Sequence, residues 1–247
     1  MAAANLSAGS SRCFVSDVST WDGERCFLST GTRRTLLWGD SFANSLAPGL
    51  AASDTDDYAI LQLTAAQCPP LTGYDAATQP ACAPFNRDAI DIIARHGISH
   101  VILAANWVSY LRRHKIALDD IGATVASLRA RGLHVIVVGQ SPVFAFRYPD
   151  EALYRRYSGL PSRDVYRAEL TVDRSINAAM AAASKADVFF DPMPVFCDGS
   201  NCAVRDHGLY LFRDYGHVTL EGSRRMASAL LMQLRTHAER AAQQPRP

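Results

Sequence analysis

The sequence predicts an α/β fold, in which a mostly parallel, five-stranded sheet is covered by helices on both faces. Short apolar runs alternate along the chain with longer amphipathic stretches. The runs are continuously apolar, which is typical of parallel strands that are buried on both faces. Strands separated by helices form βαβ units with right-handed crossovers, so the strands are expected to share one sheet.

Five apolar runs predict the strands of this sheet. They span residues 35–38, 58–63, 100–104, 133–138 and 187–190. The first run, Thr-Leu-Leu-Trp, is followed at once by Gly39, and a small residue at the end of a strand predicts a tight turn.

Helices are expected between these strands, because apolar residues there recur at a spacing of three or four. Pro84 opens one helix and Gly97 closes it, and another, on Ile121, Val125 and Leu128, stops at Gly132. Further helices are expected from residue 42 to 50, over the Ala-rich run 164–185, and after Thr219, a suitable N-cap residue.

The chain is expected to form one domain with two flanking segments. Residues 1–32 are polar and aperiodic and predict a lead-in held by its own cysteines, residues 33–240 form the domain, and residues 241–247 predict a disordered tail. Residues 64–83 and 141–164 are predicted as long loops, which are often functional. The insertion 192–215 contains the turn-like sequence Asp-Gly-Ser-Asn and predicts a small hairpin.

Composition excludes several classes of protein. Lys and Arg total 25, Asp and Glu total 24, and the net charge is +1, so no long-range field favours nucleic acid or an anionic membrane. The sequence has no apolar run of about 18 residues or more, the length that a spanning helix needs. The first six residues lack a charged region followed by an apolar core, so no signal peptide is predicted. The lack of a predicted signal peptide is expected either for a cytoplasmic protein or for a domain of a longer chain.

Six cysteines lie in three pairs that are close in sequence and fall in irregular segments. The pairs are Cys13 with Cys26, Cys68 with Cys82, and Cys197 with Cys202. Reduced thiols and a zinc site are the alternatives, but the sequence has no Cys-x-x-Cys pair or clustered histidines to complete a tetrahedral zinc site. Disulfides that close loops in an oxidising compartment are favoured, with local pairing preferred over other connectivities.

Ser41 is the candidate nucleophile. It follows the first predicted strand in Gly39-Asp40-Ser41, and an open α/β sheet binds ligands at the carboxyl ends of its strands. The helix that begins at Phe42 would point free backbone amides at the serine and stabilise an oxyanion there. The competing interpretation is that Asp40 and Ser41 only cap this helix.

His217 is the candidate base, and Asp214 the carboxylate that orients it. The two are three residues apart, just before the last predicted helix and on the carboxyl side of the sheet. Asp206-His207 is a possible decoy for this pair, and the helix start at Thr219 favours His217.

Two residues after the third strand are candidates for binding. The carboxamide of Asn106 would lie on the same edge as Ser41 and donate a second hydrogen bond to the oxyanion, or the residue is a simple turn or cap. Trp107 would form the floor of a sugar-binding cleft, or it belongs to the core, which is the favoured interpretation.

Together these residues resemble the SGNH (GDSL-like) hydrolase superfamily. The resemblance extends to its branch of periplasmic SGNH domains fused to membrane acyltransferase-three proteins. It rests on Leu37-Trp38-Gly39-Asp40-Ser41, Cys68-Pro69-Pro70-Leu71, residues 101–107 and residues 214–222, and spans roughly residues 13 to 236. It implies the SGNH hydrolase fold, a flavodoxin-like three-layer α/β/α sandwich.

The resemblance implies a role for each matched residue. Ser41 would be the nucleophile, His217 the base and Asp214 its orienter, with the Ser41 amide and the Asn106 side chain in the oxyanion hole. Gly73, which follows the second strand, is the positional candidate for a further oxyanion donor. Two departures are visible: Phe42 stands where many of these domains have His, and Ala104-Ala105-Asn106-Trp107 stands for the usual Gly-x-Asn-Asp block.

The resemblance also implies a function. The relatives O-acylate, usually O-acetylate, bacterial surface polysaccharides, so a carbohydrate acceptor and an acyl donor delivered by a fused N-terminal membrane acyltransferase domain are expected. The chain would be the periplasmic domain of an inner-membrane protein, with no cofactor, metal or nucleic-acid partner and with esterase activity when water replaces the sugar. The alternatives are a non-catalytic glycan-binding domain that serves a membrane acyltransferase, and a free-standing SGNH esterase, lipase or thioesterase.

Overall fold

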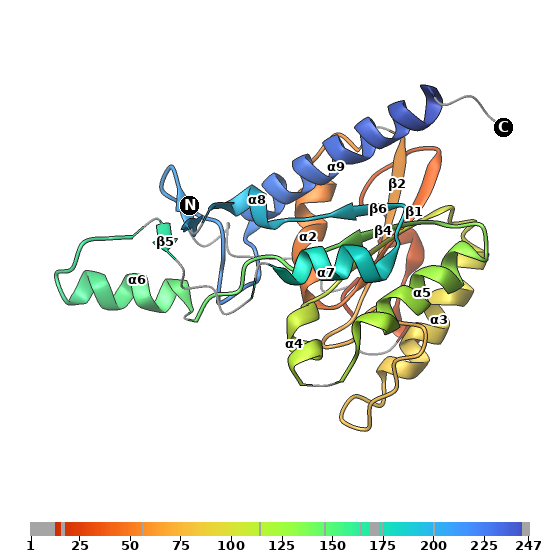
Figure 1. Ribbon diagram of the computed structural model, residues 1–247, viewed down its shortest axis with the longest axis horizontal. Helices are drawn as coiled ribbons and strands as arrows, with labels where there is room; N and C mark the ends of the chain where they lie inside the picture. The colour runs from red at the N-terminus through yellow and green to blue at the C-terminus, as the bar shows by residue number, and fades with distance from the viewer. Residues whose placement is uncertain are drawn as a thin grey trace.

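A parallel sheet with the strand order β2-β1-β3-β4-β6 forms the centre of the computed structural model (Figure 1). The structure describes residues 13–15, 18–55, 57–113, 115–145, 147–163, 165–167, 173, 175–199 and 201–243. The strands of the sheet are β1 Arg33–Gly39, β2 Tyr58–Thr64, β3 His100–Ala104, β4 His134–Val138 and β6 Val188–Phe190. This architecture confirms the predicted five-stranded α/β fold.

The five strands form at the five apolar runs because nearly every residue in them is buried. All of β2 is buried, as are the last five residues of β1 and the last four of β3 and β4. The register pairs Gly39 of β1 with Thr64 of β2 and with Ala104 of β3, so these three strands end level with one another. Whatever follows them in sequence therefore meets at one edge of the sheet.

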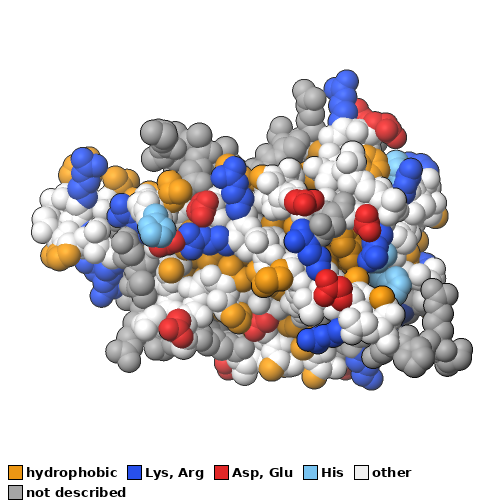
Figure 2. Space-filling model, turned by 90° about the horizontal axis from the view of Figure 1, so that it is seen from above, with side chains coloured by type: hydrophobic (Ala, Val, Ile, Leu, Met, Phe, Trp, Pro, Cys, Tyr) orange, Lys and Arg blue, Asp and Glu red, His pale blue; other side chains and the backbone are white. Residues whose placement is uncertain are grey.

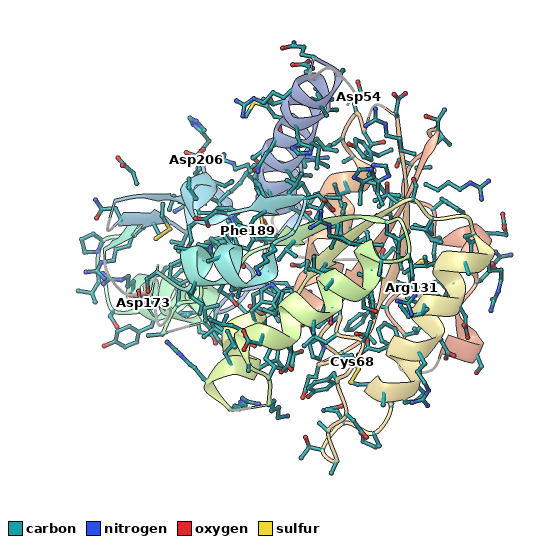
Figure 3. All side chains as sticks on the ribbon, turned by 45° about the vertical axis from the view of Figure 1, so that its right-hand side comes forward. Asp54, Cys68, Arg131, Asp173, Phe189 and Asp206 are labelled. Carbon is teal, nitrogen blue, oxygen red and sulfur yellow. A yellow bond between two sulfur atoms is a disulfide. The ribbon has the colours of Figure 1, made fainter. Side chains whose placement is uncertain are left out.

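Helices cover both faces of the sheet, so the sheet separates two layers of hydrophobic core (Figures 1 and 3). On one face, α2 Ser41–Ala51 and α9 Leu220–Gln243 pack on Leu37, Ile60 and Ile102. On the other face, the core forms around Trp38 and Leu63. The helices that contribute to it are α3 Cys82–Arg95, α4 Trp107–Arg112, α5 Leu118–Arg129 and α7 Ser175–Ser184.

Two predicted segments fold differently from expectation. The predicted loop 141–164 contains the helix α6 Tyr148–Tyr157, whose Leu153, Tyr154 and Tyr157 are exposed. The predicted helical run 164–185 is helical only in α7, and its residues Val165–Arg167 form strand β5. The remaining residues of that run before α7, apart from Asp173, lie outside the described part of the chain.

The insertion 192–215 contains the predicted hairpin. After the short helix α8 Met193–Phe196, strands β7 Cys197–Asp198 and β8 Asn201–Ala203 pair antiparallel, and β5 joins β8. Strands β9 Arg205–Asp206 and β10 Leu209–Tyr210 form a second ribbon. This ribbon leads the chain back to the edge of the sheet where α9 begins.

The described part of the lead-in covers the outer edge of β2. It contains the short 3₁₀ helices η1 Val18–Thr20 and η2 Gly23–Arg25. The backbone of Cys13 and Val15 bonds to Thr64, and Leu28 donates to the carbonyl of Ile60. A covered edge cannot pair with another chain. The lead-in is therefore bonded along the edge of the sheet through isolated bridges, although its composition predicts only a tethered arm.

The six cysteines are joined as Cys13–Cys26, Cys68–Cys82 and Cys197–Cys202, with sequence separations of 13, 14 and 5 residues. Each disulfide therefore closes a local loop. Figure 3 labels Cys68, one cysteine of the second disulfide, in the loop that follows β2.

The distribution of charge on the surface agrees with the balanced composition. Positive and negative side chains are interspersed over the face shown in Figure 2.

The last helix runs through residues 241–243, where the sequence predicts a disordered tail, and the residues after Gln243 lie outside the described part. In the described chain, none of the helices has the length and apolar character that crossing a membrane requires.

Candidate active site

Ser41 lies at the first turn of α2, directly after β1, at the carboxyl edge of the sheet. The turn depends on Gly39, because a Cβ atom there would lie 1.8 Å from the carbonyl oxygen of Ala104 on the neighbouring strand. Only glycine lets β1 and β3 approach this closely before the chain turns into the helix. In the first turn, Asp40 accepts the backbone N–H of Phe42 through its carboxylate and that of Asn44 through its carbonyl. The backbone N–H of Ser41 bonds to neither, so it is the first-turn amide that an oxyanion beside Ser41 would use.

Asp40 is buried, at 1% exposure, and its carboxylate accepts three hydrogen bonds. One oxygen accepts from the backbone N–H of Phe42 at 2.8 Å and thereby caps α2. The other accepts from the backbone N–H of Asn106 at 3.0 Å and from the hydroxyl of Tyr110 at 2.7 Å. Burial raises the pKa of Asp40, and the donors from Asn106, Tyr110 and Phe42 offset only part of that rise.

The imidazole of His217 connects Ser41 to Asp214. Its Nε2 lies 2.7 Å from the Oγ of Ser41, and its Nδ1 lies 2.8 Å from a carboxylate oxygen of Asp214. Because an ionised carboxylate only accepts, this geometry fits the tautomer with the proton on Nδ1, which leaves Nε2 to accept the serine proton. The structure thus brings together the three residues that the sequence singles out, from positions 176 residues apart.

The loop before α9 holds Asp214 in place. The second carboxylate oxygen of Asp214 accepts the backbone N–H groups of Gly216 at 3.0 Å and His217 at 2.8 Å. Burial raises the pKa of Asp214, but the hydrogen bond and charge of His217 and the two amides outweigh it. The pKa of Asp214 therefore lies below its ordinary value.

Two aromatic rings fix the orientation of His217. Phe42 lies against it with ring centroids 4.6 Å apart, and Tyr215 meets it edge-on at 5.8 Å. Phe42 is the residue that departs from the family pattern, and in this structure it packs against the base. A Cβ atom at Gly216 would lie 2.9 Å from the Phe42 ring, so the loop passes close to that ring.

A polar cleft of about 140 Å³ opens beside Ser41. Asn106 and Tyr215 lie in its wall, and so do Gln67, Arg113 and Lys115. Every described side chain in this wall is polar or a tyrosine, so the cleft offers mainly hydrogen-bonding groups and contains no aliphatic side chain. A larger hollow of about 460 Å³, lined in part by His100 and His134, lies at the opposite edge of the sheet and holds no serine.

Asn106 lies where the sequence predicts it. It follows β3 at the N-cap of α4 and shares the cleft with Ser41, while its backbone N–H bonds to Asp40. The described residues form no recorded hydrogen bond to its carboxamide, which leaves that group available to a ligand in the cleft.

The structure corrects the prediction for Gly73 and decides between the two interpretations of Trp107 in favour of the core. Gly73 is exposed, does not line the cleft, and follows Thr72, whose backbone N–H bonds to Thr124 of α5. Trp107 is fully buried in the core, and its indole N–H donates to the carbonyl of Val138 at 2.8 Å. It therefore has no surface on which a sugar could stack.

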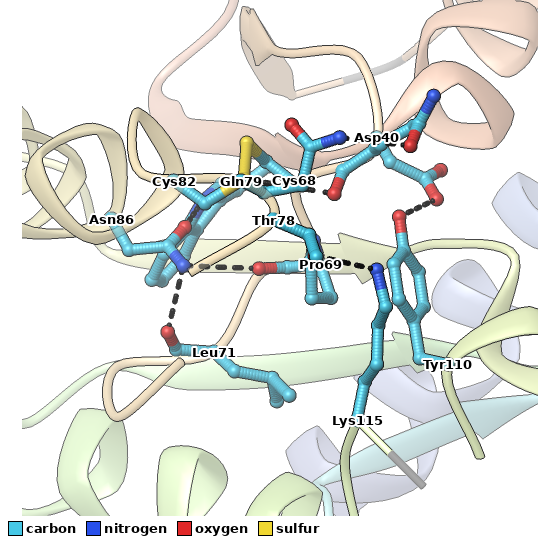
Figure 4. The surroundings of a disulfide bond; sticks show 12 residues. Asp40, Cys68, Pro69, Leu71, Thr78, Gln79, Cys82, Asn86, Tyr110 and Lys115 are labelled. Carbon is cyan, nitrogen blue, oxygen red and sulfur yellow. Dashed lines mark hydrogen bonds between the residues drawn. A yellow bond between two sulfur atoms is a disulfide. The ribbon is translucent and has the colours of Figure 1, made fainter. Parts of the chain in front are cut away.

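Gln67 is a cleft residue that the sequence does not reveal. It lies in the loop after β2 with a φ of 56°, a left-handed conformation usually taken by glycine. The Cys68–Cys82 disulfide closes this loop, and the side chain of Gln79 donates to the side-chain oxygen of Gln67 at 2.9 Å (Figure 4). Its position after the second strand is the only sequence signal that could have found it.

The decoy pair lies elsewhere. His207 is highly exposed, and Asp206 forms an ion pair with Arg225 of α9. Among the described residues, no group of three or more His, Cys, Asp or Glu side chains is arranged to hold a metal ion.

Comparison with known proteins identifies the family. Residues 12–231 match the family described as "SGNH domain (fused to AT3 domains)", so the chain belongs to this family of SGNH domains. No curated protein matches the chain.

Solved structures share the fold. The periplasmic domain of a lipopolysaccharide acetyltransferase from Salmonella ser. Paratyphi A is 19% identical, with a TM-score of 0.75 and 91% of each chain covered. A putative acylhydrolase from Bacteroides fragilis is 17% identical, with a TM-score of 0.50, and the match covers 85% of this chain and 91% of that one. At these identities the likeness is one of fold, and it confirms the predicted SGNH hydrolase fold.

Proposed function

We propose that the chain is a serine-dependent O-acyltransferase domain that acetylates a bacterial surface polysaccharide through an acyl-enzyme on Ser41. The observation that carries the proposal is the hydrogen-bonded chain from the Ser41 hydroxyl through His217 to Asp214, with distances of 2.7 and 2.8 Å. A nucleophile, a base and an orienting carboxylate in this geometry support acyl transfer. The family match and the likeness to an acetyltransferase domain support the same class of reaction.

In the first step His217 Nε2 accepts the Ser41 proton while Oγ attacks the acyl carbonyl. The backbone N–H of Ser41 and the Asn106 carboxamide would stabilise the oxyanion, since both residues line the cleft. The intermediate collapses, the leaving group takes the proton from His217, and an ester remains on Oγ.

In the second step a sugar hydroxyl gives its proton to Nε2 and attacks this ester. The acylated sugar leaves, and the proton returns to Ser41. Water in place of the sugar gives hydrolysis, which is the esterase activity of the same site.

The composition of the cleft favours a short acyl group and a sugar over a long acyl chain. The described wall around Ser41 contains no aliphatic side chain, whereas a lipase or thioesterase needs apolar surface to bury its chain. The chain would act in the periplasm as a domain of an inner-membrane protein, with the acyl donor delivered by a fused membrane acyltransferase domain. The family's description as fused to AT3 domains supports this arrangement.

The test is hydrolysis of an aryl acetate together with labelling by a serine-reactive fluorophosphonate. Wild-type protein is expected to turn over the ester and to be labelled once, and Ser41→Ala to lose both. Ser53→Ala is the matched control, because Ser53 follows the C-cap of α2, away from the cleft, and its hydroxyl donates to the backbone carbonyl of Gly49. Activity that persists in Ser41→Ala would refute the assignment, and glycan binding without labelling of the wild type would indicate a non-catalytic domain.

A further inference from the structure

The wall of the cleft beside Ser41 carries two cations, Arg113 and Lys115. The one carboxylate in the same wall, Asp40, is buried and already accepts three hydrogen bonds, so it does not face a ligand. Asp214 lies behind His217, where the imidazole and two backbone amides occupy its oxygens. The part of the cleft that a ligand can touch is therefore positive, although the whole chain is nearly neutral.

Neither cation is neutralised by a carboxylate among the described residues. The recorded ion pairs involve other residues, and Lys115 Nζ instead donates to the hydroxyl of Thr78 at 3.1 Å. Figure 4 shows Lys115 reaching to Thr78 while Tyr110 reaches to Asp40. An anion that enters the cleft would meet two cations that form no ion pair with a carboxylate in the described part of the chain.

The backbone at the end of α4 fixes the positions of Arg113 and Lys115. Arg113 is the C-cap of α4, and the backbone N–H of Lys115 bonds to the carbonyl of Tyr110 on the same helix. Asn106 is the N-cap of α4, so the helix separates it from Arg113 by about 10 Å at 1.5 Å per residue. The two cations therefore lie farther along the cleft, away from the point where the acyl carbonyl would react with Ser41.

We propose that Arg113 and Lys115 form an anion-binding subsite that selects an acidic glycan, carrying a carboxylate or phosphate, as the acyl acceptor. This inference rests on the proposed function, because it places an acceptor beside the Ser41 acyl-enzyme. The planar guanidinium of Arg113 can bind a carboxylate or phosphate through two hydrogen bonds, and the ammonium of Lys115 adds a second charge. The remaining polar wall suits the hydroxyl groups of the sugar.

The subsite is tested by binding in the Ser41→Ala background, where no turnover is needed. Calorimetry would compare a trigalacturonate with the neutral trigalactose of the same linkage. The acidic sugar is expected to bind about 10-fold more tightly, since a charge-assisted hydrogen bond at a half-exposed site contributes near the lower end of its range. This preference should weaken as salt is raised from about 0.05 to 0.5 M.

The variants assign the preference to these two cations. Arg113→Gln with Lys115→Gln is expected to reduce the acidic-to-neutral affinity ratio from about 10 to about 1. The matched control is Arg112→Gln, an exposed arginine on the same helix that does not line the cleft, which should keep the ratio of 10. Thermal unfolding of each variant would establish that it is folded.

Equal affinity for the two trisaccharides would overturn the proposal, and so would a preference that survives in the double variant. If inorganic phosphate or diphosphate competes as well as the uronate sugar does, the anion belongs to the acyl donor and the acceptor assignment is wrong. Because these measurements use a protein without Ser41, their failure is separate from the failure of aryl acetate turnover in the wild type.

Discussion

The carboxylate of Asp40 accepts the backbone N–H of Asn106 at 3.0 Å and so ties the turn after β1 to the turn after β3. The same side chain caps α2 through Phe42, one residue after the nucleophile. A single buried carboxylate thus sets the position of Ser41 relative to the carboxamide of Asn106. Asp40, which the sequence presents as part of a nucleophile motif or as a helix cap, acts as a positioning residue.

Removing one donor from this carboxylate should destabilise the protein. Tyr110→Phe leaves Asp40 with two hydrogen bonds and is expected to lower the free energy of unfolding by about 1–3 kcal/mol at neutral pH. The Tyr110 hydrogen bond lowers the pKa of Asp40, so its loss raises that pKa further, and the deficit should shrink at acid pH, where Asp40 is protonated. Urea unfolding at several pH values measures both effects.

Tyr74→Phe is the matched control for this prediction. The Tyr74 hydroxyl is buried and has no hydrogen-bond partner in the described chain, and its ring meets that of Tyr110 edge-on at 6.2 Å. Removing a buried hydroxyl without a partner should leave stability unchanged or raise it. An equal loss in both variants would mean that ring packing, not the bond to Asp40, is responsible.

Asp214→Asn should lower kcat for aryl acetate hydrolysis by about 10³- to 10⁴-fold with a small change in KM. The backbone N–H groups of Gly216 and His217 would hold the amide oxygen of asparagine, so its NH2 group would face Nδ1 and donate to it. The imidazole would then take the wrong tautomer, with the proton on the Nε2 that must accept from Ser41. Asp206→Asn removes an equivalent charge from the decoy pair and should retain full activity. Steady-state kinetics of the two variants decides between Asp214 and Asp206 as the orienter.

The lowered pKa of Asp214 also predicts a pH dependence of stability. A carboxyl whose pKa is lowered by folding stabilises the protein above its unfolded pKa, and that contribution is lost as pH falls through the folded value. The stability difference between wild type and Asp214→Asn should therefore be constant above about pH 5 and should decrease below the ordinary value of 3.8. Urea unfolding across this range is the measurement, and a difference that grows on acidification would contradict the assigned direction.

The apolar runs predict the sheet well, because a strand that is buried on both faces requires a continuous apolar sequence. All five strands appear where continuous apolar residues occur, and their level ends place Ser41, Asn106 and the His217 loop at one edge. Residues 165–167 and α6 were predicted wrongly, because both depend on pairing or context outside the main sheet. An Ala-rich or polar composition does not reveal such context.

The details of the cleft were less predictable than the triad. Gln67 has a left-handed φ that its residue type does not predict. Trp107 was the candidate sugar-stacking residue, and its burial confirms the core position that the sequence favoured as the alternative. Gly73 was placed by its order after β2, but the chain after Cys68 runs toward α5. Each of these positions is set by the loop after a strand, and local sequence constrains a loop less than it constrains a buried strand.

The Cys68–Cys82 disulfide should matter for activity as well as for stability. It closes a loop of 14 residues, for which the chain-entropy estimate is about 3 kcal/mol, and Cys82 Sγ lies 3.6 Å from the carbonyl of Gln67 in the cleft. Replacing both cysteines by serine should lower the free energy of unfolding by about this amount and reduce kcat/KM, because the loop that lines the cleft is released. Urea unfolding and aryl acetate kinetics measure the two effects.

The Cys197–Cys202 disulfide provides the matched control, since it closes 5 residues within the β7–β8 hairpin and does not line the cleft. Its double serine variant should lose less stability, because a shorter loop gains less from closure, and should keep its kcat/KM. If both double variants lose activity in proportion to stability, global unfolding explains the loss. If only the variant without the Cys68–Cys82 disulfide loses activity, at a temperature where both double variants are folded, the loop after β2 contributes directly to the active site.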